Sequence, residues 1–322
     1  MRFKRITTLL LIMLTLLCGC AREHQDEITA QPQPEQQEQY IDNYEKPNYP
    51  YVEPKEPIPL PVLMYHHFQK EPAQPNSTIV SEDSFRKQMT ALKEAGYTTI
   101  TPHELDEFMS KKAGLPEKPI LITMDDGYLS NLDIAAPILH ELNMNATVFI
   151  TGINLGRDSN PHTNVKFEQP RIDWPQANKW VRNGTIVLQS HTYDMHQKAA
   201  QGISGRDGSY PKENESEQDY VAALRRDAAL AKLTVEGRLF TRHVAIAYPY
   251  GFHNEISSRE FARSGARLLF TSVYGVSFIE PKENYEYQLF KRWAIGDEIT
   301  GEMLVNRIET LSAQKPNVTE TK

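Results

Sequence analysis

The sequence predicts an α/β fold, a parallel and somewhat distorted β/α barrel that forms a single catalytic domain. From residue 60 onward, short apolar runs alternate with amphipathic ones, which is typical of strands that alternate with helices. About seven or eight such units fit into about 240 residues, which favours a closed or nearly closed barrel over an open sheet. Acidic and histidine residues directly follow several apolar runs, and barrels carry their functional groups at the C-terminal ends of the strands.

The strand candidates are runs of β-branched and aromatic residues, and the helix candidates are amphipathic segments with capping residues. We expect strands at residues 61–65, 97–101, 120–124, 146–151, 186–190, 244–248 and 268–272, with a further candidate at 288–295. We expect helices from the cap at Ser81 to Gly96 and at 131–142, 219–236 and 255–263. Two polar insertions, 154–169 and 201–218, exceed ordinary connections and are expected to wall the site or to remain mobile.

The N-terminus has the features of a secretory leader. Three basic residues among the first five precede an apolar run at 6–17, which is too short to span a bilayer comfortably. Leu17-Cys18-Gly19-Cys20 resembles a bacterial lipobox, in which a leader assigned to residues 1–20 is cut before Cys20 and that thiol is lipidated, for instance with palmitate. The alternative is an uncleaved anchor helix with two incidental cysteines. Either reading places the rest of the chain on the extracellular face of the cytoplasmic membrane.

The lipobox interpretation also limits the chemistry of the mature chain. Both cysteines of the sequence would be used up, one removed with the leader and one bound to lipid. Disulfides and thiolate metal ligands are then excluded.

Residues 21–59 are predicted to be a disordered tether between the leader and the domain. They hold 7 Pro and 6 Gln in 39 residues and show no apolar periodicity. Their 9 acidic and 3 basic side chains account for most of the net charge of −7. The catalytic domain is expected at 60–313, followed by a disordered tail at 314–322. Because no basic patch is present, we expect no nucleic-acid partner and contact with the membrane only through the lipid. We also expect the chain to be a monomer.

The segment Thr123-Met124-Asp125-Asp126-Gly127 is the most informative motif. It ends an apolar run that has the length and composition of a buried strand. Two unpaired aspartates in a dry site would cost several kcal/mol, so a metal ion or a proton-transfer role is the usual reason for them. Asp-Asp-Gly is also ordinary turn chemistry, and other segments are needed to decide.

Two histidines follow the next strand candidate, in Ser190-His191-Thr192-Tyr193-Asp194-Met195-His196. On a helix their i, i+5 spacing would place them about 140° apart, but on a strand end that curls into a loop both imidazoles can face one point. With one carboxylate they form a two-histidine, one-aspartate set with open positions, which suits Zn²⁺ or another divalent first-row metal. A pair of surface histidines is the alternative.

Two further segments follow buried runs. Tyr248-Pro249-Tyr250-Gly251 makes a rigid turn that leaves the amide of Tyr250 free to donate, or it only terminates a strand. Pro61-Val-Leu-Met-Tyr-His66-His67 ends in two histidines, either of which could be a core histidine bonded to the backbone.

Together these four motifs resemble those of carbohydrate esterase family 4, the polysaccharide deacetylases. Their order and spelling are similar to the branch that deacetylates poly-β-1,6-N-acetylglucosamine of biofilms, over about residues 60–295. The chain departs from the common pattern: it has Met124 for Phe, the longer histidine spacing, Tyr248 in the arginine position, and no histidine after His253. The biofilm branch is circularly permuted and places its acid histidine on the first strand, which fits His66.

The resemblance implies that Asp126, His191 and His196 bind one divalent metal, Zn²⁺ first and Co²⁺, Ni²⁺ or Fe²⁺ as alternatives. It implies that Asp125 is the general base of amide hydrolysis and His66 the general acid. We infer that the amide of Tyr250 helps to hold the oxyanion.

Several residues have two interpretations each. Arg292 replaces the missing arginine and orients Asp125, or it lies on the surface. Trp174 stacks on a sugar ring, or it caps the next helix. Asp194 orients an imidazole or caps its loop, and His67 supports the site or packs in the core.

The predicted function is extracellular N-deacetylation of an N-acetylglucosamine polymer, with the biofilm polymer as the first candidate substrate. Peptidoglycan and chitin oligomers are alternatives within the same chemistry. A non-catalytic glycan-binding lipoprotein and a solute-binding lipoprotein of a transporter are alternatives from other classes.

Overall fold

The computed structural model describes residues 49–73, 78–239 and 241–314. All of them belong to the compact unit Gln39–Lys322. The predicted leader with Cys20, residues 21–48 of the predicted tether, and residues 315–322 lie outside the described residues. In the described part of the chain, no helix combines the length and the apolar character needed to cross a membrane.

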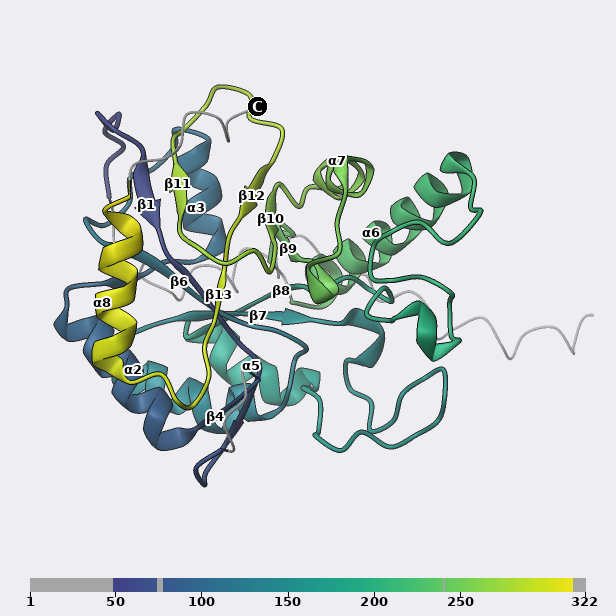
Figure 1. The fold of residues 1–322 in the computed structure, drawn as a ribbon, viewed down its shortest axis with the longest axis horizontal. Helices are drawn as coiled ribbons and strands as arrows, with labels where there is room; N and C mark the ends of the chain where they lie inside the picture. Colours follow the sequence, from purple (N-terminus) through teal and green to yellow (C-terminus); the bar gives the residue numbers. More distant parts are fainter. Residues whose placement is uncertain (1–48, 74–77, 240, 315–322) are drawn as a thin grey trace, which may run out of the picture. The chain divides into compact units, whose positions relative to one another are not determined.

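A curled sheet of parallel strands forms the centre of the fold (Figure 1). Its hydrogen-bonded order is β12-β10-β9-β8-β7-β6-β2-β13, and every pairing along this path is parallel. The predicted parallel barrel of distorted form is therefore confirmed. The strands are β2 (Val62–Tyr65), β6 (Pro119–Met124), β7 (Ala146–Ile150), β8 (Ile186–Ser190), β9 (Ala245–Ala247), β10 (Leu268–Phe270), β12 (Gln288–Phe290) and β13 (Trp293–Ala294), with β5 (Thr98–Thr99) beside the start of β6.

A single segment of chain joins the two edges of this sheet. Its first part, β12, pairs with β10, and its second part, β13, pairs with β2. The predicted strand 288–295 is thus two short strands, because the chain changes its pairing partner at Lys291 and Arg292. The amide of Arg292 instead bonds the carbonyl of Val273 at 2.9 Å.

Helices and shorter strands surround the sheet (Figure 1). α2 and α8 pack against each other, and so do α6 and α7. The helices are α2 (Glu82–Glu94), α3 (Pro102–Met109), α4 (Ala136–Glu141), α5 (Trp174–Arg182), α6 (Glu217–Leu239), α7 (Glu255–Ser264) and α8 (Gly301–Ser312), with a π-helix at Asn131–Ala135 before α4 and 3₁₀ turns at Gly152–Asn154, Ala199–Gln201 and Pro249–Gly251. The remaining strands are β1 (Ile58–Leu60), antiparallel to β11 (Ser277–Ile279), and the parallel pair β3 (His67–Gln69) and β4 (Ile79–Ser81).

Three helices, α3, α5 and α8, lie outside the helix ranges expected from the sequence. α3 begins with a capping box between Thr101 and Glu104 and has Pro102 at its first position. The predicted strand 97–101 included Thr101, but in the structure the strand ends at Thr99 and Thr101 caps α3. α8 is capped by Thr300 and begins at Gly301, whose low helix propensity conceals the start of the helix.

The folded part begins earlier than the predicted domain boundary at residue 60. Ile58–Leu60 form β1, and the ring of Tyr51 lies 6.3 Å from that of Phe108. The proline-rich and acidic composition of the tether concealed these few apolar side chains, which pack against the core of the domain.

Alternation along the strands decides which side chains enter the barrel. Val62, Leu121, Phe149 and Phe270 share one core cluster, inside the curled sheet. Their strand neighbours face outward against the helices, in the clusters around α2, α5 and α6. By the same period of two, residues 125, 191 and 292 project inward, whereas Tyr248 projects outward.

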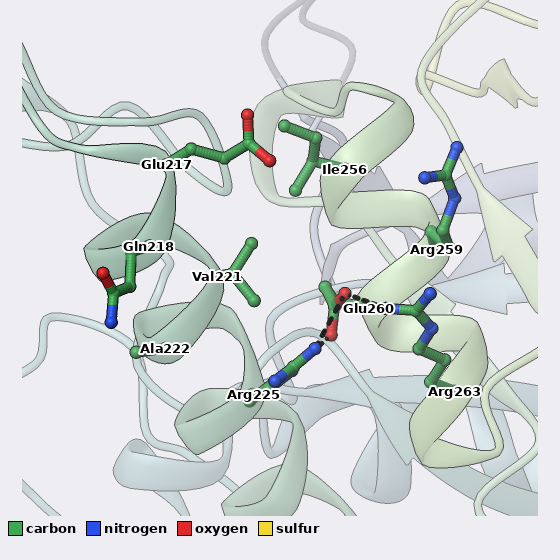
Figure 2. Close-up of a pocket in the computed structure, with 9 residues that line it drawn as sticks. All are labelled: Glu217, Gln218, Val221, Ala222, Arg225, Ile256, Arg259, Glu260 and Arg263. Carbon is green, nitrogen blue, oxygen red and sulfur yellow. Dashed lines mark hydrogen bonds and ion pairs between the residues drawn. The ribbon is translucent and has the colours of Figure 1, made fainter.

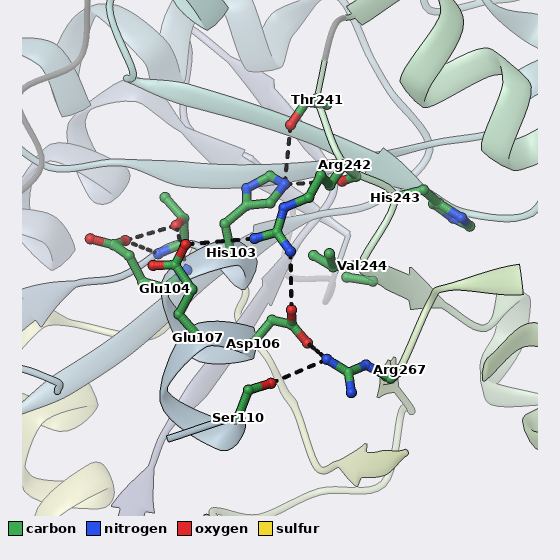
Figure 3. Close-up of polar contacts among 12 residues, drawn as sticks. His103, Glu104, Asp106, Glu107, Ser110, Thr241, Arg242, His243, Val244 and Arg267 are labelled. Atoms are coloured by element: carbon green, nitrogen blue, oxygen red, sulfur yellow. Dashed lines mark hydrogen bonds and ion pairs between the residues drawn. The ribbon is translucent and has the colours of Figure 1, made fainter. Parts of the chain in front are cut away.

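The opposite end of the barrel is held by a polar network centred on Asp106 of α3 (Figure 3). Arg267, just before β10, donates to its carboxylate at 2.7 Å, and Arg242, before β9, lies 3.4 Å away. The hydroxyl of Tyr285 also donates to this carboxylate. Asp106 is 4% exposed, so the network stabilises the buried N-terminal ends of β9 and β10.

Candidate active site

The two aspartates of the Asp-Asp-Gly motif diverge at the end of β6. The amide of Asp125 continues the strand ladder by bonding the carbonyl of Tyr65 at 2.9 Å. Asp126 then adopts a left-handed backbone conformation with φ 71°, and Gly127 follows with φ 64°. A non-glycine residue with positive φ is uncommon and costs free energy, which the surrounding fold must supply. This turn separates the two carboxylates and gives each a different set of partners.

Asp126, His191 and His196 form one cluster above the end of the barrel. One ligand atom from each lies within 4.8 Å of the others. The Oδ1 atom of Asp126 is 2.9 Å from Nε2 of His196 and 3.5 Å from Nε2 of His191. Two imidazole nitrogens and one carboxylate oxygen thus face a common point, as the i, i+5 spacing had suggested.

The hydrogen bonding of His191 shows that this cluster fits a cation. Its Nδ1 is 2.8 Å from the carbonyl of Ala247, which can only accept, so Nδ1 carries the proton. Burial lowers the pKa of His191 to about 4, so the ring is neutral at neutral pH and Nε2 presents a lone pair. That lone pair faces a carboxylate oxygen at 3.5 Å, and two acceptors so close are both satisfied by a cation that binds them together. A divalent ion with nitrogen and oxygen ligands supplies it.

Asp126 and His196 are electrostatically matched. Burial by itself would raise the pKa of Asp126, but His196 and His191 outweigh it and hold that pKa well below its usual range. Burial by itself would lower the pKa of His196, and the carboxylate of Asp126 raises it instead. The hydroxyl of Tyr250 lies 3.3 Å from Nδ1 of His196 and so meets the side of the ring that faces away from Asp126.

Asp125 is paired with Arg292 inside the barrel. Two guanidinium nitrogens donate to its two carboxylate oxygens at 2.7 and 2.8 Å, a bidentate pair between residues 2% and 1% exposed. Nε of Arg292 donates to the carbonyl of Thr271 at 2.8 Å. Burial raises the pKa of Asp125, but the charge of Arg292 leads the effects that lower it below its ordinary value. This is the contact required by the prediction that Arg292 orients Asp125.

The two histidines after β2 have different surroundings. His66 lies close enough to both aspartates to lower their pKa values, and its own Nδ1 is buried without a hydrogen-bond partner among the described residues. Asn131 donates to the carbonyl of His66 at 2.7 Å and so fixes its backbone. His67 bonds the hydroxyl of Ser130 at 2.9 Å, and burial lowers its pKa. His67 therefore links the chain after β2 to Ser130 beside the site.

The structure places the remaining predicted residues as follows. Tyr250 has φ 58°, and its ring is 4.7 Å from that of His196. Trp174 is the first residue of α5 and packs against the core cluster, whereas the cap of this helix is Asp173. Asp194 accepts from His162 at 2.7 Å rather than from a ligand histidine, so orientation of a ligand ring by Asp194 is not seen. Tyr248 points outward and bonds Ser258 at 3.1 Å, which leaves the arginine role to Arg292.

Three further residues near the cluster were not found from the sequence. Arg171 donates to the main-chain oxygen of Asp126 at 3.3 Å, and its guanidinium lies 4.1 Å from the centre of the Tyr128 ring. Asp227 of α6 bonds the loop that carries both histidines. Of the three, only Asp227 could have been noticed in the sequence, because it is an acidic residue among the apolar positions of a helix. The positions of Arg171 and Tyr128 near the cluster depend on the path of the 154–169 insertion, which the sequence does not reveal.

Comparison with known proteins agrees with this geometry. The profile of the polysaccharide deacetylase family matches residues 112–269. A Bacillus subtilis protein assigned to the polysaccharide deacetylases is 27% identical over 247 residues, 77% of this chain and 76% of its own length. The Escherichia coli poly-beta-1,6-N-acetyl-D-glucosamine N-deacetylase is 24% identical over 230 residues, 67% of this chain and 34% of its own length. The chain thus corresponds to about a third of that longer relative.

Solved structures share the fold. A de-N-acetylase from Aggregatibacter actinomycetemcomitans superposes with a TM-score of 0.65 at 21% identity, covering 77% of this chain and 99% of that one. IcaB from Ammonifex degensii superposes with a TM-score of 0.61 at 23% identity, covering 80% and 99%. These structures share the fold of the chain. The profile match over residues 112–269 and the Bacillus subtilis relative show that the chain carries a polysaccharide deacetylase domain, which is a hydrolase domain.

Proposed function

We propose that the chain is a metal-dependent N-deacetylase of an extracellular N-acetylglucosamine polymer, with poly-β-1,6-N-acetylglucosamine as the first candidate substrate. The observation that carries the proposal is that two adjacent aspartates at one strand end have different partners. Asp126 faces two imidazole nitrogens, and Asp125 is held in bidentate contact by Arg292. One aspartate is thereby available as a ligand while its neighbour stays available for proton transfer.

Asp126, His191 and His196 would hold the cation, with Zn²⁺ as the first candidate. When bound, the ion would polarise the acetyl carbonyl and lower the pKa of water in the site. The ionised Asp125 takes a proton from the water whose oxygen forms the new bond to the carbonyl carbon. Arg292 keeps that carboxylate charged and oriented, although the same pairing makes it a weaker base.

The leaving group requires a proton donor on the other side of the scissile bond. We assign this step to His66, which protonates the departing nitrogen as the carbon–nitrogen bond breaks, releasing acetate and a free amine. General acid–base steps of this kind contribute about 10²- to 10⁴-fold each. We assign the amide of Tyr250 to the oxyanion, since its left-handed turn sets the 3₁₀ segment beside His196.

The substrate and location rest on relatives and on the leader. Relatives from Escherichia coli and Staphylococcus epidermidis are named poly-beta-1,6-N-acetyl-D-glucosamine N-deacetylases, at 24% and 22% identity. The leader and Cys20 support a lipid-anchored protein at the extracellular face of the membrane. A monomer anchored in this way would act on polymer outside the cell.

The test is amine release from a β-1,6-linked N-acetylglucosamine oligomer by chelated and metal-restored protein. Asp125→Asn keeps the shape of the base but removes its charge, and we expect it to lose about 10²- to 10⁴-fold in turnover. Asp133→Asn, an exposed aspartate after the same motif, is the matched control and should keep full activity.

Chelator-insensitive release that is equal in wild type and Asp125→Asn would contradict the proposal. Release from peptidoglycan fragments or chitin oligomers alone would change the substrate and leave the reaction type standing.

A further inference from the structure

A short loop joins the two histidine ligands. The amides of Gly152 and Ile153 donate to the carbonyls of Thr192 and Tyr193 at 3.1 and 2.9 Å, and one carboxylate binds the amides of the loop. The amides of Tyr193 and Asp194 donate to the two carboxylate oxygens of Asp227, at 2.9 and 2.7 Å. Thr192, directly before them, adopts φ 65°, which is strained for a β-branched residue. The conformation between His191 and His196 therefore depends on contacts outside the loop.

Asp227 occupies a position that packing would give to an apolar residue. Its neighbours on the inner face of α6, Leu224 and Ala228, belong to an apolar cluster. Asp227 is 6% exposed, and both of its hydrogen-bond partners in the described part of the chain are backbone amides. Burial raises its pKa to about 6, although the two amides that bond it act in the opposite direction. A buried carboxylate with no cationic partner costs folding free energy, so its retention needs another explanation.

The helix that carries Asp227 is itself firmly anchored. Leu224 of α6 and Phe261 of α7 share one buried cluster, and beside the groove between the helices Glu260 of α7 accepts from Arg225 of α6 at 2.7 Å (Figure 2). The loop is fixed to the same helix by Met195, which is 7% exposed and packs in the cluster of Leu224. Asp227 therefore holds the loop at a fixed position relative to α6.

We propose that Asp227 is a positioning residue that sets the spacing of His191 and His196 for a metal ion through the amides of Tyr193 and Asp194. A carboxylate offers two acceptors in a fixed fork, so it orients two successive peptide planes at once. Metal ligands must be held within about 0.5 Å of their productive positions, and the strained loop does not achieve this by itself. The inference rests on the metal site of the proposed function.

The test compares Asp227→Asn with wild type and with Glu217→Gln, an exposed acid in the first turn of the same helix. Asparagine keeps the size of the side chain but replaces one acceptor by a donor, which cannot pair with an amide N–H. We expect Zn²⁺ affinity, measured by calorimetry on chelated protein, to fall about 10- to 100-fold in Asp227→Asn and to stay unchanged in Glu217→Gln. The visible spectrum of the Co²⁺-loaded variant should also change, because it reports ligand geometry.

Zn²⁺ affinity and a Co²⁺ spectrum equal to those of wild type in Asp227→Asn would overturn the inference while leaving the metal site intact. Wild type that binds neither ion would overturn the metal site and this inference together. Metal binding without deacetylation would contradict the proposed reaction but not the positioning role. Loss of folding in Asp227→Ala does not affect the comparison, since Asp227→Asn retains the volume and one hydrogen bond.

Discussion

The contact between Asp125 and Arg292 gives the sharpest prediction about this site. Replacing Arg292 with Gln removes the charge and the bidentate fork and leaves a carboxylate that is 2% exposed without its cationic partner. Breaking a buried pair in this way costs about 3–5 kcal/mol of unfolding free energy. At about 2–4 °C per kcal/mol for a domain of this size, the melting temperature should fall by about 6–20 °C. Arg292→Lys keeps a positive charge but cannot make the bidentate contact. Its melting temperature should therefore lie between those of wild type and Arg292→Gln.

The same substitution should invert the pH dependence that Asp125 imposes. In wild type the pKa of Asp125 is lowered, so its pairing stabilises the fold above the unfolded pKa, and that stability is lost as pH falls through the folded pKa. Without Arg292, burial dominates and raises the pKa above its ordinary value. The carboxylate then destabilises the fold as pH rises, and the acid limb of the pH–rate profile moves to higher pH.

The assay is thermal unfolding from pH 4 to 8 together with the pH dependence of amine release, for wild type, Arg292→Lys and Arg292→Gln. An acid limb that stays in place in Arg292→Gln, with unchanged turnover, would refute the role of Arg292 in holding the base. A stability loss without a shifted limb would mean that Arg292 supports the barrel but not Asp125.

Three further predictions follow from other contacts. Burial raises the pKa of Asp227 from 3.8 to about 6. In chelated protein its ionisation should therefore make wild type lose about 2 kcal/mol of unfolding free energy relative to Asp227→Asn as pH rises from 4 to 7, and melting curves that stay parallel over this range would contradict it. Asp106→Ala leaves Arg267 and Tyr285 without their shared acceptor; because the Arg267 side chain is 33% exposed and can be solvated, the change should cost about 1–3 kcal/mol in denaturant unfolding while kcat stays unchanged. A reduced kcat would show that a change at the opposite end of the barrel affects the site. His196→Ala should lower Zn²⁺ affinity by more than the 10–100-fold typical of supporting residues, and calorimetry showing wild-type affinity would exclude His196 as a ligand.

The strand-end motifs were predictable because strand periodicity and turn chemistry are local. The runs ending at Met124 and Ser190 were long and apolar enough to identify, and both strands were found close to their predicted bounds. Barrel geometry then implied that residues just beyond them would meet at one rim. The structure brings Asp126, His191 and His196 together as that argument required.

Other expectations failed where local signals compete. The tether prediction ran to residue 59 because prolines and acids outnumber apolar side chains there, yet Ile58–Leu60 pair with β11. Thr101 has β propensity and follows a strand, but its hydroxyl caps α3. In each case a tertiary contact or a cap outweighed the composition of the segment.

The sequence by itself determined the alternation of strands and helices, the inward-facing period along each strand, and the identity of the groups placed at the strand ends. Only the tertiary structure decided which distant groups support them. Arg292 reaches Asp125 across 167 positions because the closing segment changes its partner from β10 to β2 at that residue. Asp227 reaches the histidine loop because α6 packs beside β8 and presents one acidic position inward. Such pairings depend on which elements lie side by side, and local periodicity contains no information about that choice.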